Sequence, residues 1–299
     1  MVGPTVIWQT RPGRRHNVEL DYITDRVTAA LPGRPEVVFD DARFERVADA
    51  AVVVVSCGDP DTAARAAAYL EGFPPGSRIA VIHLSGETPG LPVPFYARAD
   101  LVLRNYYEPR FDDDPTVLCL PLGYNRGFWD RPSPVPVPPA VGFADRTQLW
   151  AFVGQLKSDR PKMVRQLAKI DAPSFVHLTS GWMSDDQLPI EEVHAVYERT
   201  VLVPCPFGWR SLDSFRVVEA LEAGALPVVV DPDRYFEHVF PGHPFVVGRS
   251  WRDARRRVES MRRSGELADR WGRCAVWYPA FWADLHATLR ERFAAVFGG

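Results

Sequence analysis

Four polar residues lie close together in the stretch CPFGWRSLDSFRVVEALEAGALPVVV, residues 205–230. They are Asp213, Ser214, Arg216 and Glu219. The preceding segment, VLVPCP, predicts a β-strand, and the following residues predict a helix that Asp213 caps and Gly224 ends. A helix that starts at the end of a strand presents unpaired N–H groups and a positive dipole end. Such a turn suits an anion, for example a phosphate.

Neighbouring residues add charge and backbone freedom to this turn. Gly208 permits close backbone approach, and Arg210 carries a fixed charge with a fork of donors. Arg216 and Glu219 lie three residues apart on one helical face, where Glu219 is expected to accept hydrogen bonds from sugar hydroxyls. The competing explanation is an ordinary capped helix with a solvated ion pair, which contributes little to stability. Residue by residue, both explanations stay open.

These residues need a scaffold, and strand-like segments that alternate with helix-like ones predict it. Strands are predicted in the N-terminal half at residues 5–9, 35–40, 50–58, 77–87, 100–105 and 116–123. Apolar spacing predicts helices at 18–31 and 60–72. This alternation predicts an α/β fold with a doubly wound parallel sheet.

A Pro-rich segment, residues 130–148, has neither helical nor strand periodicity and predicts a linker. The same alternation restarts after it. We expect four parts: an N-terminal acceptor-side domain 1–130, a linker 131–147, a donor domain 148–280, and a C-terminal helix 281–299 that packs back on the N-terminal domain. Two Rossmann-like domains of this kind are expected to face a cleft, with ligands outside the carboxyl ends of the strands.

Composition and charge argue against several classes of function. The net charge is −3 and no basic block occurs, so nucleic acid is not expected as a partner. No apolar run is long enough to span a membrane and no signal-peptide pattern occurs, which favours a cytoplasmic location. The four cysteines include no CxxC pair, so no metal site is expected. The first strand lacks a following GxGxxG, which argues against a nicotinamide cofactor.

The stretch 205–230 resembles the C-terminal signature of the exostosin-like glycosyltransferases, approximately CP.G...DS.R..EAL.AG.IPV. Further segments resemble the same family, most closely its ribitol-xylosyltransferase-like branch. They are HLSGE (83–87), LVLRNYYEP (101–109), LCLPLGYNRGFW (118–129) and FVGQLKSDRPKM (152–163). Two positions depart from the pattern: Ala225 stands where relatives often have Cys, and Gly86 where they often have an acid.

The resemblance implies a GT-B fold, in which two Rossmann-like domains bind a nucleotide-sugar and the C-terminal domain holds most of this donor. The three lysines of the chain, Lys157, Lys162 and Lys169, lie in one short segment. The resemblance gives a role to Lys157 and to Arg160, which follow a strand end at Gly154 and are implied to face the donor diphosphate. The expected donor-binding residues are Gly154, Lys157, Arg160, Gly208, Arg210, Ser211, Asp213, Ser214, Phe215, Arg216 and Glu219.

The general base is expected in the N-terminal domain. Glu87 is the first candidate because it follows a strand end in a Ser-Gly loop, and His83 and Asp59 are the alternatives. The residues expected on the acceptor side are Arg104, Asn105, Tyr106, Gly123, Tyr124 and Asn125. The acidic run FDDDP, residues 111–115, is interpreted as a solvated loop and not as a metal motif.

The predicted function is glycosyl transfer from a nucleoside-diphosphate sugar, with UDP as the expected nucleotide, to a hydroxyl acceptor. The resemblance implies an inverting reaction that needs no metal, and no cofactor is expected. Two alternatives stay open. One is a nucleotide-sugar epimerase or hydrolase on the same fold, and the other is an inactive transferase-like binding or scaffold protein.

Overall fold

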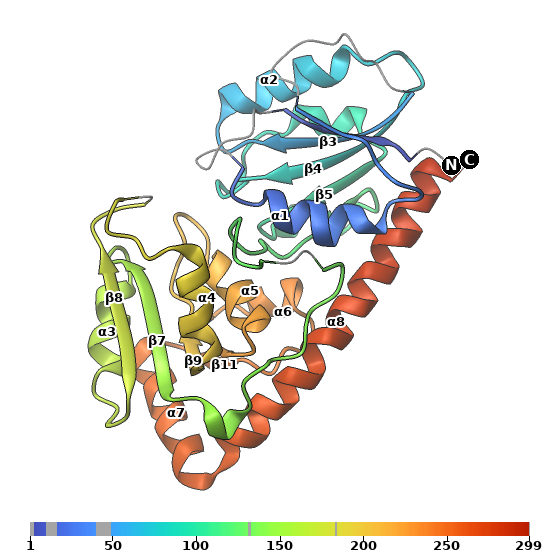
Figure 1. Ribbon diagram of the computed structural model, residues 1–299. Helices are drawn as coiled ribbons and strands as arrows, with labels where there is room; N and C mark the ends of the chain where they lie inside the picture. Colours follow the sequence, from blue (N-terminus) through green and yellow to red (C-terminus); the bar gives the residue numbers. More distant parts are fainter. Residues whose placement is uncertain (1–2, 10–16, 40–48, 131–132, 183, 299) are drawn as a thin grey trace. The chain divides into compact units, whose positions relative to one another are not determined.

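The computed structural model describes residues 3–9, 17–39, 49–130, 133–182 and 184–298, and the chain divides into two compact units (Figure 1). Unit 1 comprises Met1–Val18, Ile23–Pro121 and Asp284–Gly299. Unit 2 comprises Glu19–Tyr22 and Leu122–Ala283. The Pro-rich segment therefore belongs to unit 2, and the end of the chain belongs to unit 1.

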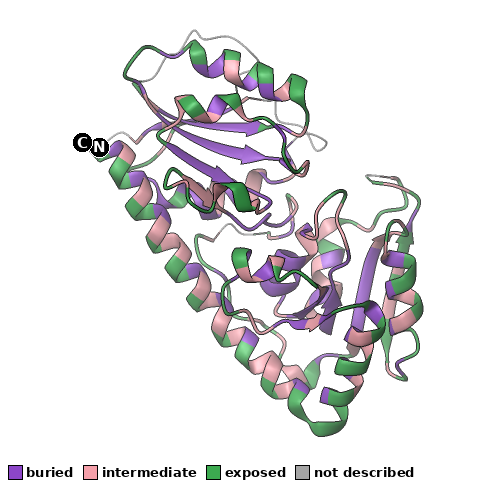
Figure 2. Cartoon of the chain, turned by 180° about the vertical axis from the view of Figure 1, so that it is seen from behind, coloured by how far each residue is buried: buried purple, intermediate pink, exposed green. Residues whose placement is uncertain are grey.

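Unit 1 is built on a six-stranded sheet in the order β2-β1-β3-β4-β5-β6. Its strands are β1 (Thr5–Trp8), β2 (Val37–Phe39), β3 (Ala50–Ser56), β4 (Arg78–Leu84), β5 (Leu101–Arg104) and β6 (Val117–Cys119). Every pairing in this sheet is parallel, as the sequence predicts. The middle strands are buried because both of their faces carry apolar side chains (Figure 2).

Helix α2 (Pro60–Glu71) covers one face of this sheet (Figure 1). Asp59 starts the helix through a capping box with Thr62, and Gly72 ends it. Its small residues Ala63 and Ala66 are buried in one apolar cluster with the strands, so the Ala-rich sequence lets the helix approach the sheet closely.

The segment expected to form one helix at 18–31 has a different structure. It contains α1 (Leu20–Tyr22), a π-helical turn at Ile23–Val27 and a 3-10 turn at Thr28–Ala30. β-Branched residues are frequent here and fit an α-helix poorly. The Thr28 hydroxyl also donates to the Thr24 carbonyl at 2.9 Å, a contact that bends helices.

Unit 2 is built on a five-stranded sheet in the order β11-β10-β9-β7-β8, again with every pairing parallel. Its strands are β7 (Gln148–Gln155), β8 (Ser174–Thr179), β9 (Thr200–Pro204), β10 (Leu226–Val230) and β11 (Val246–Gly248). Its helices include α3 (Arg160–Leu167), α4 (Ile190–Glu198), α5 (Phe215–Glu222), α6 (Tyr235–Val239) and α7 (Trp251–Ser264). The α/β class with two parallel sheets is therefore confirmed.

The last helix, α8 (Glu266–Phe297), begins in unit 2 and ends in the part of the chain that counts with unit 1. Within the described residues, no helix combines the length and the apolar character needed to cross a bilayer.

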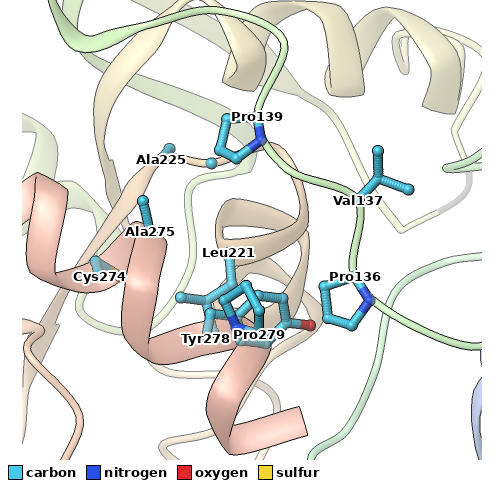
Figure 3. A pocket seen from close by; sticks show the side chains of 10 residues that line it. Pro136, Val137, Pro139, Leu221, Ala225, Cys274, Ala275, Tyr278 and Pro279 are labelled. Atoms are coloured by element: carbon cyan, nitrogen blue, oxygen red, sulfur yellow. The ribbon is translucent and has the colours of Figure 1, made fainter. Parts of the chain in front are cut away.

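The Pro-rich segment packs on the C-terminal end of α5. Pro139 and Leu221 line one small apolar hollow together with Tyr278 and Pro279 of α8 (Figure 3). The buried Arg146 side chain donates to the carbonyls of Ala223 and of Thr200. These contacts explain Gly224 at the end of the motif, because a Cβ there would overlap the Pro139 ring.

We predict that Gly224→Ala lowers the stability of unit 2 more than Gly265→Ala. Both glycines have a positive φ, +68° and +80° respectively. A Cβ at Gly224 would overlap the Pro139 ring, whereas one at Gly265 would meet nothing within 4 Å. The backbone strain costs about 1–2 kcal/mol in each variant, and overpacking adds about 1–3 kcal/mol at Gly224. Urea unfolding measures both values, and equal losses would contradict the packing argument.

Candidate functional site

The topology of unit 2 places the predicted donor residues at one edge of its sheet. Strand β7 lies between β8 and β9, so the chain leaves it toward one side and later returns on the other. Ligands of open α/β sheets bind outside the carboxyl ends of the strands at such a switch point. The loops that follow β7 and β9 lead into α3 and α5, and these loops carry the residues that the sequence assigns to the donor.

The Arg216 side chain connects the start of α5 to the end of β7. Its Nη2 and Nε donate to the Val153 carbonyl at 2.7 and 3.2 Å, and its guanidinium lies 5.1 Å from the centre of the Phe152 ring. Gly154 has φ +142°, and a Cβ there would overlap the guanidinium. Gly154 and Arg216 are therefore brought together, and the glycine is needed for the arginine to reach across the strand end.

Ser214, and not Asp213, is the N-cap residue of α5. The prediction for Asp213 was wrong because its Oδ1 accepts from the Ser214 N–H at 2.8 Å, one residue before the helix. Ser214 makes no capping bond, is 7% exposed, and its Oγ has no hydrogen-bond partner among the described residues. A buried hydroxyl without a partner is costly unless a ligand completes its bonding.

The loop between β9 and α5 folds on itself. The Gly208 N–H donates to the Ser211 carbonyl at 2.8 Å, and a Cβ at Gly208 would overlap the Asp213 carbonyl. The Ser211 hydroxyl accepts from the Asp213 N–H at 3.2 Å and donates to the Tyr235 hydroxyl at 3.4 Å. Gly208 is therefore required for a close backbone approach, as the sequence suggests.

Arg160 and Asp159 hold this loop against the start of α3. Arg160 is 6% exposed and donates to the carbonyls of Gln155 and Phe207, at 3.2 and 3.1 Å. Burial lowers its pKa to about 10. Asp159 accepts from the Phe207 N–H at 3.2 Å and from the Trp251 indole N–H at 2.6 Å. The structure thus gives Arg160 two carbonyl partners, where the sequence suggested a direct phosphate contact.

Two further cations lie on the same edge of unit 2. Lys157 is half-buried, and its Nζ lies 4.9 Å from the centre of the Trp209 ring, a distance suited to a cation–π interaction. Arg210 is exposed and follows Trp209 directly. Positive charge is therefore present in both loops, the one that leads into α3 and the one that leads into α5.

Glu219 points into the interior of unit 2 and not into solvent. It is 3% exposed, and its Oε1 accepts from Asn125 Nδ2 at 2.6 Å and from the Asn125 N–H at 3.3 Å. Burial raises the pKa of Glu219 above its usual range. Gly123 and Tyr124 lie in the same segment of unit 2, where Gly123 has φ +93° and a Cβ there would overlap the Tyr22 ring. Of the expected acceptor-side residues 123–125, Asn125 thus supports α5.

His83 is enclosed in unit 1. It is 1% exposed, and its Nε2 donates to the Cys57 carbonyl at 2.9 Å. Its Nδ1 therefore lacks a proton and accepts from the Tyr96 hydroxyl at 2.7 Å. Burial, the dominant cause, lowers its pKa to about 4. Both ring nitrogens have interior partners, which is the arrangement of a structural histidine.

Glu87 lies at the carboxyl edge of the first sheet. Its Oε1 accepts from the Tyr106 hydroxyl at 2.9 Å, which brings two of the predicted residues together. Ser85 and Tyr106 have φ of +64° and +62°, and they follow β4 and β5 respectively. Strained backbone at non-glycine residues is retained most often at functional sites. Glu87 is half-buried, so its carboxylate is held in place without being enclosed.

The other predicted residues of unit 1 have structural partners. Asp59 caps α2, and N–H donation from Thr62 holds the pKa of Asp59 below its usual range. Arg104 is buried, pairs with Glu108 at 3.0 Å and lies over the Phe111 ring. Asn105 is also buried, and its amide donates to the Pro121 carbonyl at 3.0 Å.

The acidic loop satisfies its own side chains in part. Asp114 accepts from the Thr116 N–H at 2.9 Å, and Asp112 accepts from the Tyr107 hydroxyl at 2.7 Å.

Sequence reasoning missed Trp182. This residue is 61% exposed, and its ring is stacked on Phe215, the first residue of α5. The available signal was a tryptophan in the segment GWMSDD, which follows a predicted strand and ends in three polar residues.

No protein-family model matches the chain, and no curated protein matches it. Solved structures do match. A crystal structure of an α1,3-fucosyltransferase aligns over 100% of this chain and 90% of its own, with a TM-score of 0.58 and 10% identity. An α-glucosyltransferase in complex with UDP and a 13-mer DNA containing an HMU base aligns over 97% of this chain and 100% of its own, with a TM-score of 0.52 and 9% identity. At such low identity the likeness shows the fold: the chain has the two-domain GT-B fold of glycosyltransferases.

We predict that His83 makes stability fall as the pH is lowered from 6.5 toward 4. The pKa of His83 is about 4 in the folded protein against an ordinary value of 6.5, so in this window only the unfolded chain takes up the proton. The loss approaches about 3 kcal/mol below this range. His83→Gln keeps a donor and an acceptor but does not titrate. Urea unfolding at pH 7 and pH 4.5 should show a smaller loss in the variant, and equal losses would contradict a buried neutral imidazole.

Proposed function

We propose that this protein is a glycosyltransferase whose unit 2 binds a nucleoside-diphosphate sugar. The observation that carries the proposal is the contact of Arg216 with Val153 across Gly154. This contact fixes the first turn of α5 at the switch point of the second sheet. The fold is that of nucleotide-sugar transferases, and one of the matched solved structures holds UDP.

The donor diphosphate is proposed to bind at the N-terminus of α5. The helix dipole and the first N–H groups favour negative charge there. The buried Ser214 hydroxyl lacks a protein partner among the described residues and would donate to a phosphate oxygen. Lys157 and Arg210 supply the charge that stabilises the departing diphosphate, while Arg160 and Asp159 keep their loop in place.

Glu87 is proposed as the general base. Its carboxylate accepts the proton of the acceptor hydroxyl as the acceptor oxygen bonds to the anomeric carbon of the sugar. The bond from that carbon to the β-phosphate oxygen breaks, and the nucleoside diphosphate leaves with the electron pair. The Tyr106 hydroxyl, 2.9 Å from Glu87 Oε1, holds the carboxylate in position. We further propose UDP as the nucleotide, an inverting single displacement and a distant relation to the exostosin-like transferases, on the strength of the motifs at 83–87 and 205–230.

Release of nucleoside diphosphate from a panel of UDP- and GDP-sugars, with mixed hydroxyl acceptors, tests the proposal. We expect turnover with a nucleotide-sugar and an acceptor present together. Glu87→Gln should lower turnover by about 100- to 10,000-fold while leaving donor affinity unchanged, because the amide keeps its size but cannot take the proton.

Asp59→Asn is the matched control, since asparagine caps a helix as well as aspartate does. This variant should keep the wild-type rate. Loss of activity in Asp59→Asn with a fully active Glu87→Gln would assign the base to Asp59 instead. Absence of any nucleotide-sugar turnover in the wild type would contradict the proposed function.

A further inference from the structure

Two tryptophans of unit 2 have exposed rings, unlike most residues of their size. Trp182 is 61% exposed and Trp209 is 68% exposed. Tryptophan is enriched at binding interfaces, because its large ring is apolar and its N–H can find a polar partner. The ring of Trp209 already has a neighbour, because Lys157 Nζ lies 4.9 Å from its centre. Trp182 is supported from one side by Phe215, with centroids 6.4 Å apart and planes 14° from parallel.

The loop that carries Trp182 follows β8 (Figure 1), and Asp186 bonds to several of the described residues in and beside it. The Asp186 carboxylate accepts from the Ser180 N–H at 2.8 Å and from the hydroxyl of Ser184. The His177 ring donates to the Asp186 carbonyl at 2.7 Å, and Gln155 at the end of β7 donates to the Ser180 carbonyl at 3.1 Å. Trp182 is therefore exposed to solvent beside hydrogen-bonded residues of this loop. The loop lies at the carboxyl end of β8, the same edge of the sheet as the proposed diphosphate site.

The neighbours of this ring identify the chemistry of its ligand. Phe215 is the first residue of α5, and the preceding Ser214 carries the buried hydroxyl that has no partner among the described residues. An aromatic face thus adjoins the helix end that is proposed to bind the diphosphate, through the consecutive residues Ser214 and Phe215. A nucleoside diphosphate has the matching form, because it carries a planar ring covalently joined to two phosphates. A free sugar ring also stacks on tryptophan, but it brings no anion to the helix end.

We propose that Trp182, supported by Phe215, stacks on the nucleobase of the donor. This inference rests on the proposed function and adds a residue that binds the base. Stacking uses the face of the ring and no base-specific hydrogen bond, so Trp182 contributes affinity for any base that the site admits.

The experiment is calorimetric titration of the full-length protein with UDP, GDP and inorganic pyrophosphate. Loss of a base–aromatic stack corresponds to about a 5- to 150-fold weakening of binding. Trp182→Ala should weaken the better nucleoside diphosphate by this factor and leave pyrophosphate affinity unchanged. Trp182→Phe retains an aromatic face and should recover most of the loss.

Trp209→Ala is the matched control, because it removes the other exposed indole and the ring against which Lys157 lies. It should weaken pyrophosphate and nucleoside diphosphate by the same factor. If Trp182→Ala also weakens both equally, or neither, the stacking role is wrong while the diphosphate site stands. Wild-type protein that binds pyrophosphate as tightly as both nucleotides would likewise contradict the stacking role and leave the diphosphate site intact. Wild-type protein that binds none of the three ligands overturns the proposed function itself.

Discussion

The candidate site of unit 2 depends on one contact, in which the Arg216 guanidinium donates two hydrogen bonds to the Val153 carbonyl. The contact joins the last buried residues of β7 to the second residue of α5. It is possible only because Gly154 has no side chain. Once α5 is fixed in this way, its N-terminus faces the switch point, and Asp159 and Arg160 can fasten the preceding loop through Phe207. Arg210, Ser214 and Phe215 lie on this loop and helix, so these hydrogen bonds restrict the backbone that carries the charge, the hydroxyl and the aromatic ring.

Buried polar groups make this arrangement costly to disturb. Glu219 lies about one turn after Arg216 and accepts a hydrogen bond from Asn125. Burial raises the pKa of Glu219. A buried carboxylate of this kind is stable only while its partners stay in place. In unit 1 the comparable group is His83, which lies between Cys57 and Tyr96 and stays neutral. Each unit thus has a hydrogen-bonded polar group in its interior and more accessible residues at the carboxyl edge of its sheet. The proposed base, Glu87, and the proposed diphosphate-binding cations, Lys157 and Arg210, are among these more accessible residues.

The sequence predicted the two parallel sheets because apolar runs such as residues 50–56 and 226–230 have the form of strands buried on both faces. Two local predictions were wrong. The helix predicted at 18–31 is interrupted, and the N-cap of α5 is Ser214, one residue after the predicted Asp213. Local sequence patterns could not predict the hydrogen-bond partners of the buried polar side chains. Asn125 and Glu219 are separated by 94 positions in the sequence, and no spacing rule connects them. The position of Trp182 likewise follows Ser180, whose N–H donates to Asp186 six positions later.

The loop and helix at residues 205–222 are proposed to bind a nucleoside diphosphate. Thermal unfolding with a panel of nucleoside diphosphates, each repeated with EDTA, tests it most directly. A ligand at 100 times its Kd adds about 2.7 kcal/mol of stability, enough to raise the Tm of a protein of this size by a few degrees. We expect at least one nucleoside diphosphate to raise the Tm and EDTA to leave the shift unchanged. A Tm that no nucleotide changes would contradict this claim and favour a protein that keeps the GT-B fold without a donor site.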